Sequence, residues 1–333
     1  MAAASPGERG LAEQILAPIA RELAATEALI HLKLSSDVPF IARAGEYLFE
    51  SGGKRMRPAL LLLCARLLDR LGDEAVTYAA VVEFIHAATL IHDDIIDHAP
   101  LRRGRRTVNA MWGSNLTVLL GDWLYTTAMR MALEHDNLAI IELFCDATLR
   151  MTEGELLVLE RLGAIDLTVE EYFEIIDRKT AALFAAACAA PAAIGPAESR
   201  HADALARFGR ALGISFQLVD DVLDFTASED ELGKPVLSDL REGKLTLPVL
   251  LALPRVAPAE REAIRSVLED GGFRRTDPGR VLEMVRREGC LEEAVDAARE
   301  WGETALAALS DLPDGEARQA LEAAPAYVLR RHA

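Results

Sequence analysis

The chain has 333 residues, of which 51% are hydrophobic and 27% charged, a balance typical of a globular rather than a disordered protein. Lys and Arg number 36 against 53 Asp and Glu, so the formal net charge is −17. This charge argues against a general nucleic-acid binder, because no overall positive field offsets phosphate repulsion. Any phosphate site would have to be built locally, from clustered Lys and Arg or from bound cations.

Helical periodicity dominates the chain, and alternating β-branched runs are scarce. Helices are expected over residues 10–34, 38–50, 58–70, 73–98, 107–133, 136–160, 169–190, 200–225, 245–255, 258–269, 278–287, 290–310 and 316–330. Many of the breaks coincide with proline, which removes a backbone donor and clashes inside a helix. No stretch reads as a linker between domains. The sequence predicts an all-α fold, a single domain over residues 1–333 with roughly 10–13 helices, and disorder is allowed over residues 1–10.

The four cysteines, Cys64, Cys145, Cys188 and Cys290, are widely spaced and form no CxxC pair. We expect buried free thiols in a reducing compartment. The first ten residues contain no basic region followed by an apolar run, so no secretory signal is expected. The longest uncharged stretch, 180–197, is interrupted by proline and glycine and is too weakly apolar for a membrane span. We therefore expect a soluble, cytoplasmic protein.

Two aspartate clusters are the sharpest feature of the sequence. Both have DDxxD spacing: Asp93, Asp94 and Asp97 in HDDIID, and Asp220, Asp221 and Asp224 in FQLVDDVLDF. With 22 aspartates in the chain, one such pattern should occur by chance about 0.1 times. Two such patterns in one chain exceed this chance expectation about twenty-fold.

Both clusters lie within apolar helical runs, where residues four apart share a face and like charges repel. One interpretation is a solvated helix face that screens the repulsion. A bound cation accounts better for two clusters, and oxygen ligands without thiolates suit Mg²⁺, which commonly bridges to substrate phosphates.

Basic residues that could hold a diphosphate occur in short groups. SGGKRMRP at 51–58 places three cations between a glycine pair and a proline suited to a helix start, and four arginines follow the first aspartate cluster in PLRRGRR. Three isolated lysines, Lys179, Lys234 and Lys244, belong to the same set of candidates. His86 completes it, because it lies two helical turns before Asp93 and so shares its face. Each group taken alone is explained equally well or better by a basic helix cap, surface charge balance, a surface lysine or a buried core histidine.

In this order, GGKRMRP, HDDIID with PLRRG, FQLVDDVLDF, LGKP and GKLTLP resemble the all-trans isoprenyl diphosphate synthases, over about residues 45–250. The resemblance implies a helical bundle around a deep central cavity, with two aspartate motifs on facing helices that hold about three Mg²⁺ ions. It also implies the reaction: Mg²⁺ ions stabilise the departing diphosphate of an allylic substrate, and the double bond of isopentenyl diphosphate attacks the allylic carbocation. RRGRRT departs from the family's usual RRGxPT, which we interpret as tolerable loop variation.

The resemblance also implies roles for individual residues. Asp93, Asp97 and Asp220 would ligate metal directly, and Asp94, Asp221 and Asp224 would support them. Arg102, Lys179, Lys234 and Lys244 would hold the allylic diphosphate, and Lys54, Arg57, His86 and Arg103 would hold isopentenyl diphosphate. Thr180 and Gln217 would face the carbocation, so Lys179, Thr180 and Gln217 form the expected catalytic group.

Product length is expected to depend on Ala88 and Thr89, which precede Asp93 by about one helical turn. In the family, bulky aromatic side chains here close the tunnel at farnesyl or geranylgeranyl length. Small residues predict a long-chain product, as in octaprenyl to decaprenyl synthases. The tunnel floor would then lie deeper, and the candidates are Val81, Ile85, Met129 and Met131. The alternative is that Ala88 only packs helices and another side chain closes the tunnel early, which would give a short-chain synthase.

Other functions remain open at this stage. A class I terpene cyclase would share the first DDxxD, but it would lack the second and the GGKRMRP site. A regulatory subunit would tend to lose aspartates, whereas a catalytic subunit that needs a small partner is allowed. The resemblance implies a homodimer, and membrane contact would at most be peripheral.

Overall fold

The computed structural model describes residues 6–50, 55–102, 104–195, 199–227 and 235–330. The first half contains α1 (Pro6–Leu16), a 3₁₀ turn (Ala17–Ile19), α2 (Ala20–Lys33), α3 (Pro39–Glu50), α4 (Met56–Leu67), α5 (Asp73–Ile96), β1 (Leu101–Arg102), β2 (Arg105–Arg106), α6 (Val108–Trp112), α7 (Ser114–Ala132), a 3₁₀ turn (Leu133–His135) and α8 (Leu138–Glu160). The second half contains α9 (Val169–Ile176), a π-helical turn (Asp177–Ala181), α10 (Ala182–Ala189), a 3₁₀ turn (Ala190–Ala193), α11 (Ser199–Thr226), α13 (Ser238–Arg241), α14 (Leu247–Ala252), α15 (Pro258–Asp270), α16 (Pro278–Arg287), α17 (Cys290–Ala308) and α18 (Glu316–Leu329). The predicted all-α fold class is confirmed.

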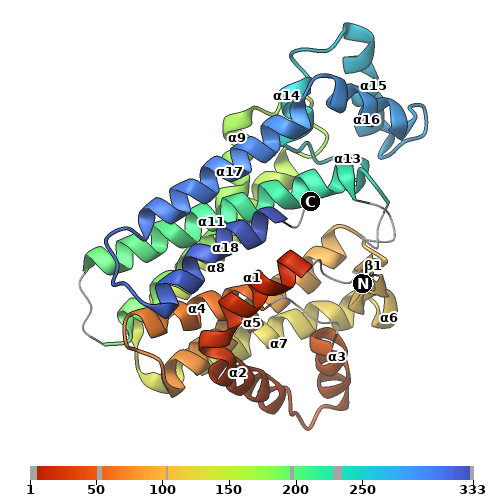
Figure 1. The fold of residues 1–333 in the computed structure, drawn as a ribbon. Helices are drawn as coiled ribbons and strands as arrows, with labels where there is room; N and C mark the ends of the chain where they lie inside the picture. Colours follow the sequence, from red (N-terminus) through yellow and green to blue (C-terminus); the bar gives the residue numbers. More distant parts are fainter. Residues whose placement is uncertain (1–5, 51–54, 103, 196–198, 228–234, 331–333) are drawn as a thin grey trace.

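Long helices stack side by side, with α4, α5 and α7 on one side of the bundle and α11, α17 and α18 on the other (Figure 1). The buried side chains from Ile15 to Val328 form one hydrophobic cluster. Helix α4 is buried over most of its length, since Met56 and every residue from Pro58 to Ala65 are buried. A helix that is apolar all round has to lie inside a bundle, which explains why α4 shows little amphipathic pattern.

Judged by length and composition alone, α5 could cross a membrane. In this structure, 72% of its most apolar window is buried inside the protein. The apolar character of α5 is therefore accounted for by its place in the core.

Two of the predicted helices are interrupted at a proline or a glycine. The predicted helix 10–34 is broken by the 3₁₀ turn at Ala17–Ile19, where Pro18 cannot donate a backbone hydrogen bond. The predicted helix 107–133 divides at Gly113, whose φ of 82° is accessible to glycine at little cost. At the N-terminus, α1 begins at Pro6, so helix extends into the region where disorder was allowed.

The predicted helix 169–190 contains a five-residue π-helical turn, Asp177–Ala181, between α9 and α10. Such turns insert one extra residue and are frequent at functional sites. Two glycines allow other helices to come close to it. A Cβ on Gly154 of α8 would lie 2.7 Å from the backbone nitrogen of Lys179, and a Cβ on Gly213 of α11 would lie 2.7 Å from Cα of Ala181. The turn is thus held between α8 and α11.

All four cysteines are free thiols, as predicted. Cys64, Cys188 and Cys290 are buried, but Cys145 is exposed on α8, so the expectation that it is buried is wrong. Asp146 follows it directly, and both residues lie on the exposed side of α8, beside Met129 of α7.

Candidate active site

The first aspartate cluster lies at the C-terminal end of α5, and each of its three carboxylates has one basic partner. Arg102 Nε lies 2.7 Å from Asp94 Oδ1, and Lys244 Nζ lies 2.7 Å from Asp97 Oδ1. Lys179 Nζ lies 3.8 Å from Asp93 Oδ2 and also pairs with Glu155 of α8. These are three of the four cations that the resemblance assigned to the allylic diphosphate.

The three cations come from segments far apart in the chain. Arg102 is on β1, Lys179 is in the π-helical turn, and Lys244 follows Gly243, whose φ is 84°. The backbone N–H of Lys244 donates to the Asp239 carbonyl at 2.8 Å, which ties this segment to α13. The fold thus brings together charges that are far apart in the sequence, such as Asp97 and Lys244, which are 147 positions apart.

Burial divides the six aspartates into two groups. Asp94, Asp221 and Asp224 are buried, with at most 3% of their surface exposed. Asp93, Asp97 and Asp220 keep partly exposed surface. This division coincides with the one that the resemblance implies between direct metal ligands and supporting residues, and the metal-binding roles themselves stay predictions.

Negative charge at the first cluster is only partly compensated. Burial raises the pKa of Asp93 to about 6, and the neighbouring carboxylates of Glu155 and Asp97 raise it while Lys179 and Arg102 lower it. Burial also raises the pKa of Asp94, against the opposing effect of Arg102. Burial alone would lower the pKa of Lys244, but Asp97 raises it above its usual value. A further cation bound at this end of α5 would stabilise the ionised form of these carboxylates.

The second cluster lies near the C-terminal end of α11, and Asp224 has a structural role there. Its Oδ1 accepts hydrogen bonds from the backbone N–H and the hydroxyl of Ser238, at 3.2 and 2.8 Å. Its Oδ2 accepts from the backbone N–H of Asp239 at 3.1 Å. Asp224 therefore holds the first turn of α13 in place.

Asp221 belongs to a separate set of hydrogen bonds. Tyr172 of α9 donates its hydroxyl to Asp221 Oδ2 at 2.5 Å, and Gln217 Nε2 donates to Asp221 Oδ1 at 2.7 Å. Thr180 in turn donates to Gln217 Oε1 at 2.7 Å. Burial and the nearby Asp239 raise the pKa of Asp221, while the hydrogen bonds from Tyr172 and Gln217 oppose that rise. The predicted catalytic pair, Thr180 and Gln217, is thus in direct contact.

A cavity of about 160 Å³ lies beside this set. Its polar wall includes Tyr172, Lys179, Thr180, Gln217, Asp221 and Lys244. Its apolar wall comes from the end of α8, from α9 and from the segment before α14. Ligand sites typically combine an apolar wall with a few convergent polar groups, and this cavity does so next to both aspartate clusters.

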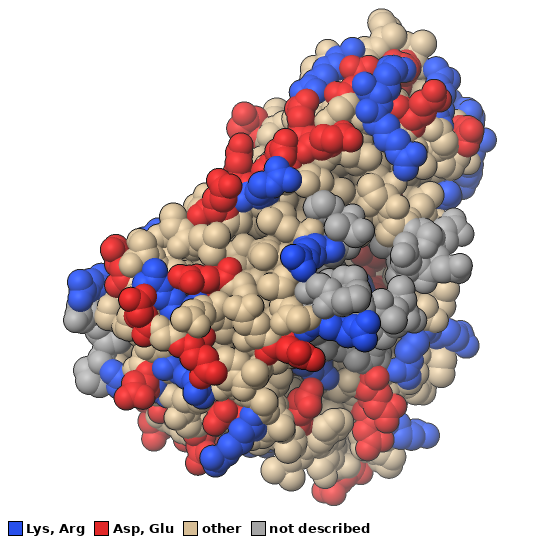
Figure 2. Space-filling model, viewed as in Figure 1, with Lys and Arg blue, Asp and Glu red and all other residues tan. Residues whose placement is uncertain are grey.

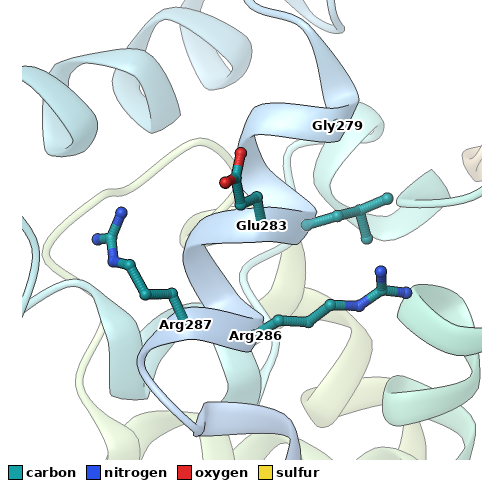
Figure 3. Close-up of a pocket in the computed structure, with 5 residues that line it drawn as sticks. Gly279, Glu283, Arg286 and Arg287 are labelled. Carbon is teal, nitrogen blue, oxygen red and sulfur yellow. The ribbon is translucent and has the colours of Figure 1, made fainter.

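A second hollow lies on the far lobe, against α16, and it lacks those features. The lobe formed by α15 and α16 projects from the bundle, and many arginine side chains gather on it (Figures 1 and 2). In this hollow Arg286 and Arg287 point away from each other and Glu283 points outward, so the polar groups do not converge (Figure 3). Arg287 is already paired with Glu260 at 2.8 Å. We do not assign a ligand to this surface.

Two residues predicted to bind isopentenyl diphosphate lie next to each other. Arg57 NH1 lies 3.2 Å from His86 Nε2, and the Arg57 guanidinium stands 4.4 Å above the centre of the buried Phe184 ring. Arg55, from the same basic motif, is used differently. It has a left-handed φ of 48° and its NH1 lies 2.5 Å from Glu83 Oε1. Arg55 therefore anchors the start of α4 to α5, and Arg57 is directed to His86.

The β1–β2 hairpin explains how the unusual RRGRRT sequence is accommodated. The Arg105 guanidinium stacks 4.4 Å over the Tyr47 ring, and the Tyr47 hydroxyl donates to the Arg106 carbonyl at 2.7 Å. Arg106 NH2 donates to the Ala110 carbonyl of α6 at 2.5 Å. Arg105 and Arg106, which follow Gly104 in this motif, thus hold the hairpin that carries Arg102 against α3 and α6.

The predicted chain-length residues lie on the buried part of α5. Ala88 is 3% exposed, and Thr89 is half-buried with its hydroxyl donating to the His86 carbonyl at 2.9 Å. Among the candidate floor residues, Val81, Ile85 and Met131 have no exposed surface. Met129 faces α8, with its sulfur 3.9 Å from Cys145 Sγ. The region below Ala88 is therefore packed with side chains in this form of the protein.

Three predicted binding residues, Lys54, Arg103 and Lys234, lie outside the residues that the structure describes. Conversely, the sequence analysis did not single out Glu155, Tyr172, Asp239 or Tyr47, all of which contact the site or its supports. The sequence held one weak signal for Glu155, an acidic residue directly after the small Gly154 on the inner side of α8. Tyr172 and Asp239 gave no signal, because their partners are far away in the chain.

The donor set fits a divalent metal bound together with a phosphate ligand. The partly exposed donors are carboxylates, which suit a hard cation. In the part of the chain that the structure describes, no three carboxylate, imidazole or thiol groups lie close enough to enclose a metal by themselves. Mg²⁺ commonly takes one or two carboxylates and completes its shell with water and substrate phosphate, so such an open arrangement is what it requires.

Comparison with known proteins agrees with this geometry. The model of the polyprenyl synthetase family matches residues 38–285. The octaprenyl diphosphate synthase of Escherichia coli K12 is 40% identical over 310 residues, which cover 93% of this chain and 95% of that protein. A polyprenyl synthase from Caulobacter crescentus CB15, solved with calcium and isoprenyl diphosphate, superposes with a TM-score of 0.92 at 36% identity over 97% of this chain and 98% of its own. A decaprenyl diphosphate synthase from Rhodobacter capsulatus gives 0.90 at 38% identity over 97% and 99%. The chain belongs to the polyprenyl synthetase family.

Proposed function

We propose that this protein is a prenyltransferase that condenses isopentenyl diphosphate with an allylic diphosphate to make a long-chain, all-trans polyprenyl diphosphate. The observation that carries the proposal is the pairing of Arg102, Lys179 and Lys244 with the three carboxylates of the first aspartate motif. These six charges surround the place where a diphosphate and its cations would bind. The predicted polyprenyl diphosphate synthase activity agrees with the family and with relatives that cover more than nine-tenths of the chain.

Asp93, Asp97 and Asp220 would hold the divalent cations, and Asp94 would be held in place by Arg102. When bound, the cations would supply Lewis-acid stabilisation of the negative charge on the departing diphosphate. Arg102, Lys179 and Lys244 would bind the same diphosphate, and their fixed positions lower the reorganisation needed as the charge develops. The identity of the metal as Mg²⁺ and the number of ions remain predictions.

On the acceptor side, Arg57 and His86 would bind the diphosphate of isopentenyl diphosphate, together with Lys54 and Arg103. Thr180 and Gln217 would present oxygen atoms to the carbon that becomes positively charged. Both lie beside the cavity, where an apolar wall excludes water that would otherwise quench a carbocation.

The reaction can be tested with purified protein, labelled isopentenyl diphosphate and farnesyl diphosphate. We expect label to enter an apolar, acid-labile product when Mg²⁺ is present. Chelation by EDTA should stop incorporation, and added Mg²⁺ should restore it. Incorporation that is unaffected by EDTA would contradict the proposed role of the aspartates.

Tyr47 offers a test of the hairpin that carries Arg102. Replacing Tyr47 by Ala removes the ring beneath Arg105 and the hydrogen bond to the Arg106 carbonyl. We expect KM for the allylic diphosphate to rise about ten-fold, because a misplaced Arg102 loses part of a charge-assisted contact. Tyr47→Phe keeps the ring and should produce a smaller rise. Equal KM values for the wild type and Tyr47→Ala would show that the hairpin is positioned by other contacts.

We further propose that the protein is a homodimer in which α7 and α8 meet their symmetry copies. Exposed leucines and a valine lie along these helices and their ends: Leu116, Val118, Leu119, Leu133, Leu138, Leu149, Leu156 and Leu159. Leu149 and Leu156 are seven residues apart and share one face of α8. An apolar surface of this kind is uncommon on a monomer, and two-fold symmetry would cover it with the same surface.

The double variant Leu119→Asp, Leu149→Asp tests this interface. The two side chains are 63% and 60% exposed in the single chain, so the substitutions should leave its core intact. We expect light scattering to give twice 36.2 kDa for the wild type and 36.2 kDa for the variant. Leu306→Asp, at a leucine 39% exposed on α17, is the matched control and should remain dimeric. A dimeric double variant would place the interface elsewhere.

The cytoplasmic location and any peripheral membrane contact remain parts of the proposal. The substrates carry charged diphosphates and fit a soluble enzyme, whereas a long prenyl product would have to reach a membrane.

A further inference from the structure

Four side chains from three elements form a continuous chain of hydrogen bonds beside the cavity. Tyr172 of α9 donates to Asp221 of α11 at 2.5 Å, and Gln217 donates to the other oxygen of Asp221 at 2.7 Å. The chain ends at Thr180 in the π-helical turn, which donates to Gln217 Oε1 at 2.7 Å. All four residues line the same cavity.

This chain fixes the orientation of the Gln217 amide. The NH₂ end of the amide faces Asp221, so the carbonyl end, Oε1, faces Thr180. Because the Thr180 hydroxyl proton points to Oε1, the lone pairs of the Thr180 oxygen remain directed elsewhere. The oxygens of Thr180 and Gln217, which carry partial negative charge, are thereby held next to each other beside the cavity.

Tyr172 lies at the start of the chain and is well placed to hold it. Tyr172 and Asp221 are each only 3% exposed. The first turn of α9, which carries Tyr172, is fixed by the capping box of Thr168 and Glu171. The hydrogen bond from Tyr172 to Asp221 therefore costs little additional conformational entropy. Both oxygens of Asp221 accept from protein donors, which is not the arrangement expected of a residue reserved for a cation.

We infer that Tyr172 is a positioning residue, which acts through Asp221 to aim the oxygens of Gln217 and Thr180 at the carbon that becomes cationic. The inference rests on the proposed function and assigns Asp221 a positioning role in place of metal support. Preorganised dipoles of this kind stabilise a developing charge without reorganising during the reaction. Tyr172 itself touches neither the diphosphate-binding cations nor the first aspartate cluster in any contact described above.

The test is Tyr172→Phe, which removes only the hydroxyl. We expect kcat to fall about ten-fold, while KM for both substrates and the Mg²⁺ concentration for half-maximal activity stay within about two-fold. Tyr78→Phe is the matched control, because Tyr78 is also buried and donates to a carboxylate, Glu74 at 3.3 Å, near the opposite end of α5. The control should keep the wild-type kcat, and a fall of the same size in both variants would overturn the inference.

A double-mutant cycle shows whether Tyr172 acts through Gln217. Gln217→Met should lower kcat by at least as much as Tyr172→Phe. Adding Tyr172→Phe to Gln217→Met should then cause no further fall, because the oxygen that Tyr172 helps to aim is already absent. Independent falls that multiply would contradict the inference.

Asp221→Asn gives a second reading that does not depend on Tyr172→Phe folding. The inference predicts a lower kcat with the Mg²⁺ requirement within about two-fold of the wild type, and unchanged calorimetric binding of a non-reactive allylic diphosphate analogue. A Mg²⁺ requirement raised about ten-fold or more would instead show that Asp221 acts mainly through the metal. Failure of the proposed function would be seen separately, as an inactive wild type.

Discussion

Replacing Asp93 by Asn should lower kcat by about 10³-fold or more. Direct metal ligands that stabilise a departing diphosphate contribute several kcal/mol, and each 1.36 kcal/mol is a factor of ten in rate. Asp93 is partly exposed, faces Lys179 and lies among the charges of the first aspartate cluster. The measurement is single-turnover condensation at saturating Mg²⁺, and Asp220→Asn should show a loss of similar size.

The same substitution should leave the metal-free protein at least as stable as the wild type. Burial raises the pKa of Asp93 to about 6 in the folded protein, from an ordinary value of 3.8. The folded state therefore prefers the protonated form, and stability is lost as the pH rises from about 4 to 6 and Asp93 ionises. At pH 7 the neutral Asn side chain avoids that cost.

Glu303→Ala, on the exposed face of α17, is the control and should change neither activity nor the thermal midpoint. Loss of activity together with loss of stability in Asp93→Asn would indicate a structural role. Near-normal turnover by Asp93→Asn would remove the argument for the metal site.

Replacing Ala88 by Phe should shorten the product to about farnesyl or geranylgeranyl length. Ala88 lies five residues before Asp93 on α5 and is 3% exposed, so a large ring there would project into the tightly packed region below the aspartates. A graded series, Ala88→Val, Leu and Phe, should shorten the product step by step while condensation continues. The measurement is product length by chromatography against prenyl standards.

Overpacking the core costs about 1–3 kcal/mol, so the Ala88→Phe variant should be assayed below its thermal midpoint. A product of wild-type length from a folded, active Ala88→Phe enzyme would show that the prenyl chain follows another path. If Val81 and Ile85 form the tunnel floor, a long product also requires their side chains to move aside, because both are fully buried in this structure.

Much of the fold could be predicted from local pattern. The long apolar stretches of α4 and α5 and the proline positions gave most of the helices. The interruptions at Pro18 and Gly113 were missed because helical periodicity continues across them. The π-helical turn at Asp177–Ala181 was missed for a different reason, since nothing in its own sequence marks it. The turn is contacted by Gly154 of α8 and Gly213 of α11, and these tertiary contacts cannot be predicted from the sequence of the turn.

The site shows a similar division. The aspartates and their basic partners were identified because each motif is local, and the resemblance then supplied their common purpose. The structure adds which cation faces which carboxylate: Arg102 with Asp94, Lys244 with Asp97, and Lys179 with Asp93. The Tyr172–Asp221 contact joins residues 49 positions apart and could not be read from either segment alone.

The measurement that tests the central claim most directly is mass spectrometry of the product made from isopentenyl diphosphate, farnesyl diphosphate and Mg²⁺ by the purified wild-type protein. The account predicts a polyprenyl diphosphate of about eight isoprene units or more, in line with the relatives described above and with the small side chain at Ala88. A product that stops at geranylgeranyl diphosphate would keep the reaction and contradict the open-tunnel argument. Cyclised hydrocarbon, or no elongation by a folded enzyme supplied with Mg²⁺, would contradict the proposed function itself.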